Sequence, residues 1–256
     1  MMLLLENFNL GKYRLIILTL LSVPLFLTID SQYGDSLFFG KGQYITLFLV
    51  LVAFVYAYNR SVQRVKYVML IGMFVGMAGE FFFSLVMGMY HYRLDNVPLW
   101  LVFGHGLIFA VVFKFSHSPH VKKNKDTIQS VLLVFAMLYG LFWLFWANDW
   151  FGFACTIAFI VILFNVKKSR LFFLIMFTII CYVEQVGTAT GCWYWPDTVM
   201  SSLSWFPSGN PPSGIAVFYF LFDAIVFYVY LNIMHPNTKL RYKRARAHTS
   251  YVRKGE

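Results

Sequence analysis

The stretch YVMLIGMFVGMAGEFFFSLVMGMYHYRLDNVPLWLVFGHGLIFA, from Tyr67 to Ala110, decides how the rest of the chain is interpreted. It contains one carboxylate, Glu80, in a long apolar run, then an aromatic segment, and then a second apolar run that holds His105. Runs of this length and apolarity are typical of transmembrane helices. Because an ionisable side chain is costly inside a membrane, Glu80 is predicted to have a function or a buried partner.

The composition extends this interpretation to the whole chain. Of its 256 residues, 59% are hydrophobic and 12% are charged, whereas soluble domains have about 25% charged residues. We therefore predict an all-α polytopic membrane protein. The net charge of +10 does not indicate a nucleic-acid partner, because the basic residues cluster in the short segments between apolar runs.

Eight transmembrane helices are predicted, each close to the ~20 residues needed to cross the hydrocarbon core. They cover residues 13–30, 43–59, 67–89, 98–115, 127–147, 151–166, 171–191 and 213–234. If the N-terminus is cytoplasmic, only Lys41 and Arg93 lie outside, and the other 19 of the 21 Lys and Arg residues lie inside. This asymmetry predicts that both termini are cytoplasmic. The expected location is the cell (inner) membrane.

A second stretch, LFFLIMFTIICYVEQVGTATGCWYW from Leu171 to Trp195, repeats the pattern, with Glu184 in the place of Glu80. Each glutamate lies 13 residues after the start of its span, at Tyr67 or Leu171. At the rise of an α-helix this places both carboxylates roughly 20 Å from the cytoplasmic end, in the outer half of the bilayer.

The correspondence continues beyond the glutamates. The segment Gly88-Met-Tyr90-His-Tyr92 corresponds to Gly191-Cys-Trp193-Tyr-Trp195. We predict that the chain consists of two parallel four-helix repeats, related by an axis along the membrane normal. They comprise residues 1–126 and 127–234, and a basic cytoplasmic tail follows at residues 235–256.

Four ionisable side chains are predicted to lie at overlapping depths and to be catalytic: Glu80, Glu184, His105 and Asp223. In the returning spans His105 and Asp223 lie roughly 10 and 16 Å below the outer surface. We expect one chamber that opens outward, in which the glutamates act as acid and base and the other two residues orient them. The alternative is that these side chains bond across helix interfaces and only stabilise the packing.

Aromatic side chains are predicted to surround this chamber and to bind the substrate: Tyr90, Tyr92, Trp100, Trp193, Trp195 and Tyr219. An aromatic belt at the outer membrane interface is the alternative explanation for most of them. The outer connection from Trp193 to Gly214 is rich in Pro, Gly and Ser and is a candidate lid. The segment from Ala147 to Trp150 is expected to be only a tight turn.

No metal site and no cofactor are predicted. Two Glu, one Asp and one His are acceptable ligands for zinc, manganese or iron, so a metal centre is the rival interpretation. The sequence contains neither an H-E-x-x-H motif nor a histidine-rich segment that would favour it. The three cysteines show neither zinc-ligand spacing nor a disulfide framework.

The segment Glu184-Gln-Val-Gly187-Thr-Ala-Thr190-Gly191 resembles the E-x-x-G-x-x-T-G segment of the carotenoid-biosynthesis membrane proteins that include the carotenoid hydratases. In that family an aromatic Y-x-Y follows, where this chain has Trp193 and Trp195. The Pro-Phe-Gly that comes next in the family is absent. The resemblance implies hydration or related acid–base chemistry on a long isoprenoid, with Glu184 as a site residue.

The predicted function is therefore that of an integral membrane enzyme. It is expected to do acid–base chemistry (hydration, isomerisation or hydrolysis) on a lipid or isoprenoid, with membrane lipids as its surroundings and partners. Two alternatives stay open: a proton-coupled transporter of a small molecule or lipid, and a non-catalytic membrane scaffold or receptor.

Overall fold

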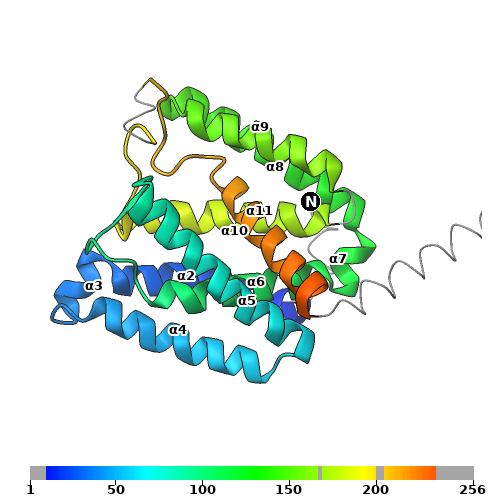
Figure 1. Cartoon of the computed structure of the whole chain (residues 1–256), viewed down its shortest axis with the longest axis horizontal. Coiled ribbons are helices and arrows are strands. Elements are labelled where there is room, and N and C mark those ends of the chain that lie inside the picture. Colours follow the sequence, from blue (N-terminus) through cyan, green and yellow to red (C-terminus); the bar gives the residue numbers. More distant parts are fainter. Residues whose placement is uncertain (1–9, 167–168, 200–204, 235–256) are drawn as a thin grey trace, which may run out of the picture.

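The computed structural model describes residues 10–166, 169–199 and 205–234, and these residues form a bundle of helices that run mostly side by side (Figure 1). The longer α-helices are α2 (Leu10–Asp30), α4 (Gly42–Asn59), α5 (Gln63–Glu80), α6 (Trp100–Ser116), α8 (Lys125–Ala147), α9 (Trp150–Asn165), α10 (Arg170–Ala189) and α11 (Ala216–Tyr228). The shorter elements are the helices α3 (Gln32–Leu37) and α7 (Pro119–Lys123), the π-helices η1 (Phe81–Val86) and η3 (Val229–Met234), and the strands β1 (His91–Tyr92) and β2 (Trp193–Tyr194).

Within the residues that the structure describes, six helical segments are long and apolar enough to cross a membrane. They are Tyr13–Asp30, Gly42–Asn59, Gln63–Val86, Lys125–Ala147, Arg170–Ala189 and Ala216–Met234. The prediction of an all-α, multi-pass membrane protein is thereby confirmed. The other two predicted spans fall on α6 and α9, which are apolar helices of 17 and 16 residues. By length and composition the described residues thus support six crossings, and the prediction of eight is not confirmed.

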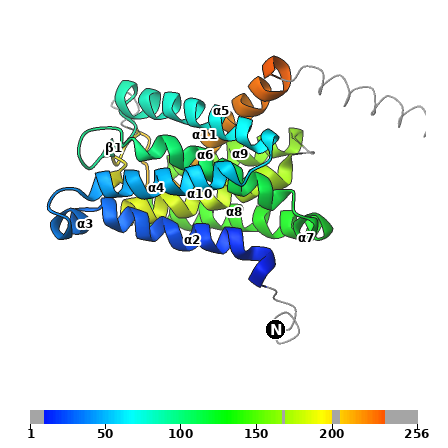
Figure 2. The same cartoon turned by 90° about the horizontal axis from the view of Figure 1, so that it is seen from below.

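The two ends of the bundle differ. One end, here called the hairpin end, carries α3 and the paired strands β1 and β2, and the opposite end carries α7 (Figures 1 and 2). The first turns of α2 and the last turn of η3 also lie at the α7 end (Figure 2). The described chain therefore begins and ends on the same side of the bundle.

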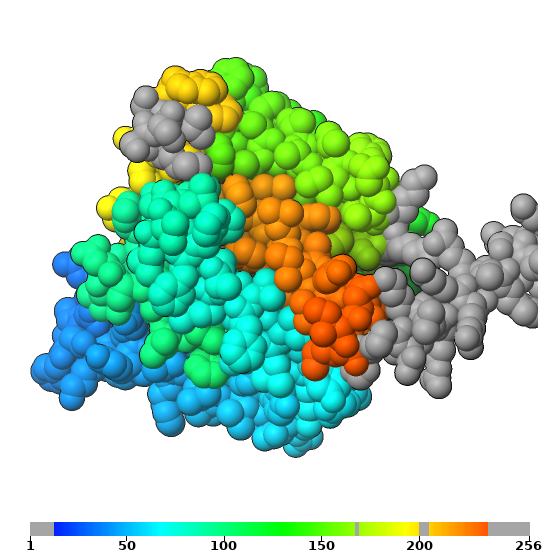
Figure 3. Space-filling view, viewed as in Figure 1, coloured from blue at the N-terminus to red at the C-terminus, as the bar shows by residue number. Residues whose placement is uncertain are grey.

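Four helices surround the middle of the bundle: α5, α6, α10 and α11. Helix α5 packs against α6 and α11. Helix α10, which belongs to the second half of the chain, packs against the same two helices. Helices α2 and α4 cover α6, while α8 and α9 cover α10 and α11. In the space-filling view α11 lies between α5 and α9 on one face of the molecule (Figure 3).

Helix α10 is the most enclosed of the candidate spans. In the most apolar part of α10, 67% of the residues are buried inside the protein, compared with 11% in the corresponding parts of α2 and of α8. The outer helices instead expose large apolar side chains such as Phe48 and Phe145, as expected for a surface that faces lipid. The central position of α10 matters because this helix carries Glu184.

Two predicted features fall partly or wholly outside the described residues. The basic tail, residues 235–256, lies outside them, and so do residues 200–204 of the candidate lid.

Candidate active site

A cavity lies between α5, α6, α10 and α11, toward the hairpin end, and it brings together all ten side chains singled out in the sequence. Its lining includes Glu80, Tyr90, Tyr92, Trp100, His105, Glu184, Trp193, Trp195, Tyr219 and Asp223. Its volume open to the centres of water-sized molecules is about 80 Å³. Since one water needs about 10–15 Å³ by this measure, several waters or a segment of an apolar chain fit inside.

Glu80 lies at the point where α5 continues as the π-helix η1, and its side chain is 3% exposed. The hydroxyl groups of Tyr90 and Tyr92 both donate hydrogen bonds to its Oε2 atom. His105 Nε2 is 2.9 Å from its Oε1 atom, a contact that becomes an ion pair when the imidazole is protonated. Glu80 thus has three potential donors, enough to satisfy an ionised carboxylate without water.

Glu184, which is 5% exposed on α10, has a matching set of partners. Its Oε2 atom accepts hydrogen bonds from Trp193 Nε1 at 2.9 Å and from Trp195 Nε1 at 3.2 Å. The hydroxyl group of Tyr219 is 3.5 Å from its Oε1 atom. In each glutamate, two aromatic side chains therefore donate hydrogen bonds to Oε2, and one side chain contacts Oε1. That side chain comes from the next long helix in the chain: His105 of α6 for Glu80 and Tyr219 of α11 for Glu184.

The aromatic donors are positioned by the pairing of the two short strands. Strands β1 and β2 are antiparallel, with His91 opposite Tyr194 and Tyr92 opposite Trp193. Successive residues of a strand point to opposite faces. The aromatic residues that flank His91 and Tyr194 in the sequence therefore point away from these two, toward the inside of the protein. Tyr90, Tyr92, Trp193 and Trp195 are between 4% and 8% exposed. These four residues line the cavity and do not form an interfacial belt.

The two donor sets differ in chemistry. A tyrosine hydroxyl can donate and accept, whereas an indole N–H can only donate. Oε2 of Glu184 is therefore an acceptor, and a proton carried by this carboxyl group must sit on Oε1, which faces Tyr219. Burial and the neighbouring Glu80 raise the pKa of Tyr92 and of Tyr90 above the ordinary value, so both hydroxyl groups stay protonated and donate hydrogen bonds to Glu80.

Two glycines make this arrangement possible. A Cβ atom on Gly76 would lie 2.4 Å from Cγ of His105, and one on Gly187 would lie 1.9 Å from Cζ2 of Trp193. These distances are far shorter than any normal contact, so the His105 and Trp193 rings occupy the space that larger residues would fill. The absence of a side chain at Gly76 on α5 and at Gly187 on α10 therefore lets the site side chains approach these helices closely.

Asp223 lies on α11 and is 4% exposed. Although it lines the cavity, it makes no hydrogen bond to either glutamate, and its Oδ2 atom has no partner among the described residues. The expectation that Asp223 orients a glutamate is therefore not met. That contact is made by Tyr219, one helical turn earlier, whose ring also stacks on His105 with centroids 5.8 Å apart.

The four ionisable residues do not form a metal-ligand set. Within residues 10–166, 169–199 and 205–234, no three His, Cys, Asp or Glu side chains are close enough together to hold a metal ion. The hydrogen bonds described above occupy the glutamate oxygens that the rival interpretation assigned to a metal.

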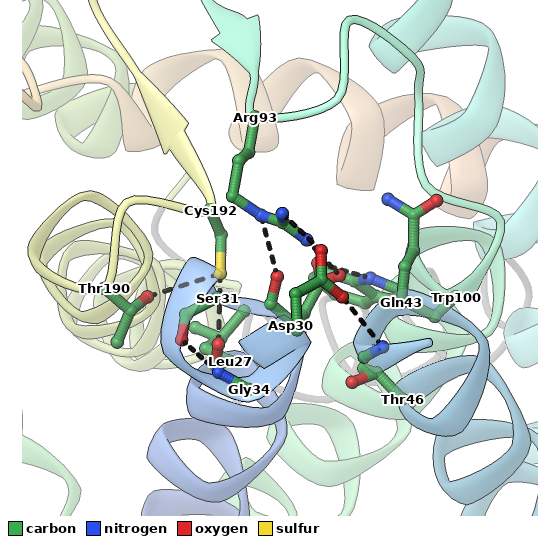
Figure 4. A network of polar contacts seen from close by, with 12 residues as sticks. Leu27, Asp30, Ser31, Gly34, Gln43, Thr46, Arg93, Trp100, Thr190 and Cys192 are labelled. Atoms are coloured by element: carbon green, nitrogen blue, oxygen red, sulfur yellow. Dashed lines mark hydrogen bonds and ion pairs between the residues drawn. The ribbon is translucent and has the colours of Figure 1, made fainter. Parts of the chain in front are cut away.

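A polar network at the hairpin end supports the site and was not predicted from the sequence (Figure 4). Arg93 donates to Asp35 Oδ2 at 2.6 Å and to the backbone oxygen of Asp30 at 3.0 Å. The cavity residue Trp100 donates from Nε1 to Asp30 Oδ2, also at 3.0 Å. Arg93 follows Tyr92 directly, so this network fixes the strand that supplies the Glu80 donors. Its only sequence signal is that Arg93 is one of the two outer basic residues.

Asp149 is a second residue whose role was missed, because its segment was expected to be only a tight turn. It is fully buried and accepts three backbone hydrogen bonds, from Gly152 at 2.9 Å, Gly209 at 2.8 Å and Ser213 at 2.7 Å. The first caps the N-terminus of α9. The other two hold the connection that leads into α11, which carries Tyr219 and Asp223.

The comparisons with known proteins give no family. No protein family matches the chain, and no curated protein or solved structure matches it either.

Proposed function

We propose that this protein is an integral membrane enzyme that does acid–base chemistry on a lipid or isoprenoid. One observation carries the proposal: two buried glutamates with different donor sets share an aromatic-lined cavity inside an apolar bundle. Intramembrane carboxylates that face a cavity are typical of functional sites. A matched pair in different environments is how enzymes separate an acid from a base.

The proposed roles follow from the hydrogen bonds. Glu184 is the acid, because its indole donors leave Oε1 as the only position for its proton. Glu80 is the base, because its two tyrosine donors and His105 stabilise a carboxylate anion.

Alkene isomerisation and hydration both fit these roles. The Glu184 proton adds to one alkene carbon, the π-electron pair forms the new C–H bond, and a carbocation remains on the other carbon. Glu80 then removes a proton from the adjacent carbon, which re-forms an alkene, or from a water molecule that adds to the cation. The faces of the surrounding Tyr and Trp rings stabilise the cation through cation–π attraction.

The same proposal includes the finer membrane arrangement. We infer that α6 and α9 also cross the bilayer, giving eight spans in two parallel four-helix repeats with both termini in the cytoplasm. The basic connections at the α7 end support this orientation for a cell (inner) membrane protein. The local resemblance to carotenoid-biosynthesis membrane proteins supports an isoprenoid as the substrate.

The packing on the α7 side of the cavity favours an enzyme over a proton-coupled transporter. Phe109, Phe172 and Phe227 contact one another there, with ring centroids 5.2–5.5 Å apart. A transporter must open this side to the cytoplasm, which requires the three rings to separate.

The test is a comparison of lipid extracts from cells that make acyclic polyene isoprenoids and express the full chain. Wild type is expected to yield an isomerised or hydrated isoprenoid that cells without the chain lack. Glu184→Gln and Glu80→Gln are each expected to lower its amount at least ~100-fold, the usual effect of a general acid or base. Asp126→Asn, which changes an exposed acid at the start of α8, is the matched control. Identical lipid profiles for wild type and both glutamate variants would refute the proposal.

A further inference from the structure

Asp223 is the one acid of the cavity whose environment the proposed chemistry does not explain. Its side chain is 96% buried, since only 4% is exposed, and Oδ2 has no hydrogen-bond partner among the described residues. A buried polar atom without a partner costs about 1–3 kcal/mol. Since no side chain or backbone group in the described part of the chain pairs with Oδ2, Asp223 destabilises the empty site.

The position of Asp223 separates it from the two glutamates. His105 and Tyr219, which contact the glutamates, lie seven residues after Pro98 and Pro212, respectively. Eleven residues after the same prolines come Phe109 and Asp223, one helical turn deeper, or roughly 6 Å. Both line the cavity. At the level of the glutamates, the two equivalent positions thus hold side chains with the same role, since His105 and Tyr219 each contact a glutamate. At the deeper end the equivalent positions differ, because one holds the phenyl ring of Phe109 and the other the carboxyl group of Asp223.

A ligand made only of hydrocarbon leaves this carboxyl group without a partner. A hydroxyl group satisfies it in either protonation state, because a hydroxyl can both donate and accept. The rest of the deeper lining is apolar and includes Met176 and Val226, which suits the chain that bears the hydroxyl group.

We propose that the cavity binds an apolar chain that carries a hydroxyl group, and that Asp223 accepts the hydrogen bond of that hydroxyl. The proposal rests on the proposed function and adds a class of substrate to it. The hydroxyl group fixes the direction in which the chain enters. It places the reacting carbons roughly one helical turn closer to the hairpin end, between Glu80 and Glu184.

Binding of three matched probes tests this assignment: farnesol, farnesylamine and farnesene, which share a carbon skeleton and carry a hydroxyl, an amine or no polar group. The full chain in detergent micelles is titrated with each probe at constant micelle concentration. The change in tryptophan fluorescence is followed, since Trp100, Trp193 and Trp195 line the cavity. Phe74→Leu changes a side chain that is 74% exposed, and it serves as the control for partition of the probes into the micelle.

Wild type is expected to bind farnesol about tenfold more tightly than farnesene, the usual effect of one hydrogen bond to a carboxyl group. Asp223→Leu is expected to abolish this preference and to raise the melting temperature, because a buried carboxyl group without a partner is replaced by an apolar side chain of similar size. Asp223→Asn keeps an acceptor but loses the capacity for a negative charge. It is therefore expected to retain the preference for farnesol over farnesene, but to bind the ammonium form of farnesylamine no better than farnesene, because the buried charge then has no opposite charge beside it.

Equal binding of farnesol and farnesene by wild type, or no saturable binding of farnesol, overturns the proposal. So does an unchanged farnesol preference in Asp223→Leu, or, where that variant does not fold, a lost preference in Asp223→Asn. Glu184→Gln separates this proposal from the proposed function. It is expected to lose turnover and keep the farnesol preference, so a failure of catalysis leaves the binding result intact.

Discussion

Substitution of Gly187 by alanine tests the geometry of the Glu184 site most directly. A Cβ atom at this position would lie 1.9 Å from Cζ2 and 2.0 Å from Cη2 of Trp193. The Trp193 side chain is only 5% exposed, and the atoms that the added Cβ would meet belong to its indole ring, which can move only as a unit. The ring must be displaced, and its 2.9 Å hydrogen bond to Glu184 is then lost.

The magnitude follows from three terms. Overpacking a buried site costs about 1–3 kcal/mol, and leaving the buried indole N–H without its partner costs about 1–3 kcal/mol. Alanine in place of glycine within a helix contributes about 1 kcal/mol of stability. The free energy of unfolding is therefore expected to fall by roughly 1–5 kcal/mol, measured by titration with sodium dodecyl sulfate in mixed micelles.

Gly72→Ala is the matched control, because it makes the same change on a buried helix face. Its Cβ atom would lie 3.8 Å from the nearest atom of Phe109, an ordinary contact, so the variant is expected to be neutral or up to about 1 kcal/mol more stable. Trp193→Phe removes the atoms that clash. The double variant is therefore expected to lose about 1–3 kcal/mol less than the sum of the two single variants. Equal stability of Gly187→Ala and Gly72→Ala would show that Trp193 does not pack on Gly187, and the described hydrogen bonds of Glu184 would be wrong.

Three further predictions concern the supports of the site and its topology. Arg93→Ala leaves two acids of the hairpin end without their cation and is expected to lower the unfolding free energy by about 3 kcal/mol; a loss no larger than that of the exposed control Lys41→Ala contradicts the network. Asp149→Ala removes the acceptor of three backbone N–H groups and is expected to cost about 3–5 kcal/mol in the same titration; a cost below about 1 kcal/mol is incompatible with its burial. Because the three native cysteines are buried, single cysteines can be labelled in the native chain: Phe39→Cys is expected to react with an impermeant maleimide on intact cells and Arg60→Cys only after lysis, and the reverse pattern excludes the proposed orientation.

The glutamate pair could be predicted from the sequence because helical rise is regular. Glu80 and Glu184 lie equally far from the starts of their spans, so equal depth follows without knowledge of the packing. The alternation of aromatic residues around His91 and Tyr194 likewise gives two inward-facing pairs once the strands are paired. Local periodicity was enough to choose these residues.

The supporting residues could not be predicted in this way. Asp30 and Arg93 are 63 residues apart in the chain, and Asp149 binds backbone groups 60 and 64 residues away. Such contacts depend on how the connections at the hairpin end fold over one another, and no local pattern encodes that. The exchange of roles between Asp223 and Tyr219 has a similar cause. Both lie on the inner face of α11, and only the packing decides which one reaches Glu184.

The relation between the two halves of the site favours an enzyme over a non-catalytic scaffold. The predicted repeat makes His91 and Tyr194 equivalent, and the same two residues lie opposite each other in the strand pair. Two antiparallel strands that meet at equivalent residues are what a two-fold axis requires, so the register supports our proposal of a duplicated chain. With identical halves, both glutamates would have the same partners and neither could specialise as the acid. The halves differ where a proton would be held: tyrosines and His105 surround Glu80, and tryptophans and Tyr219 surround Glu184. A packing scaffold gains nothing from this difference, whereas an enzyme that must give a proton at one carboxyl group and take one at the other requires it.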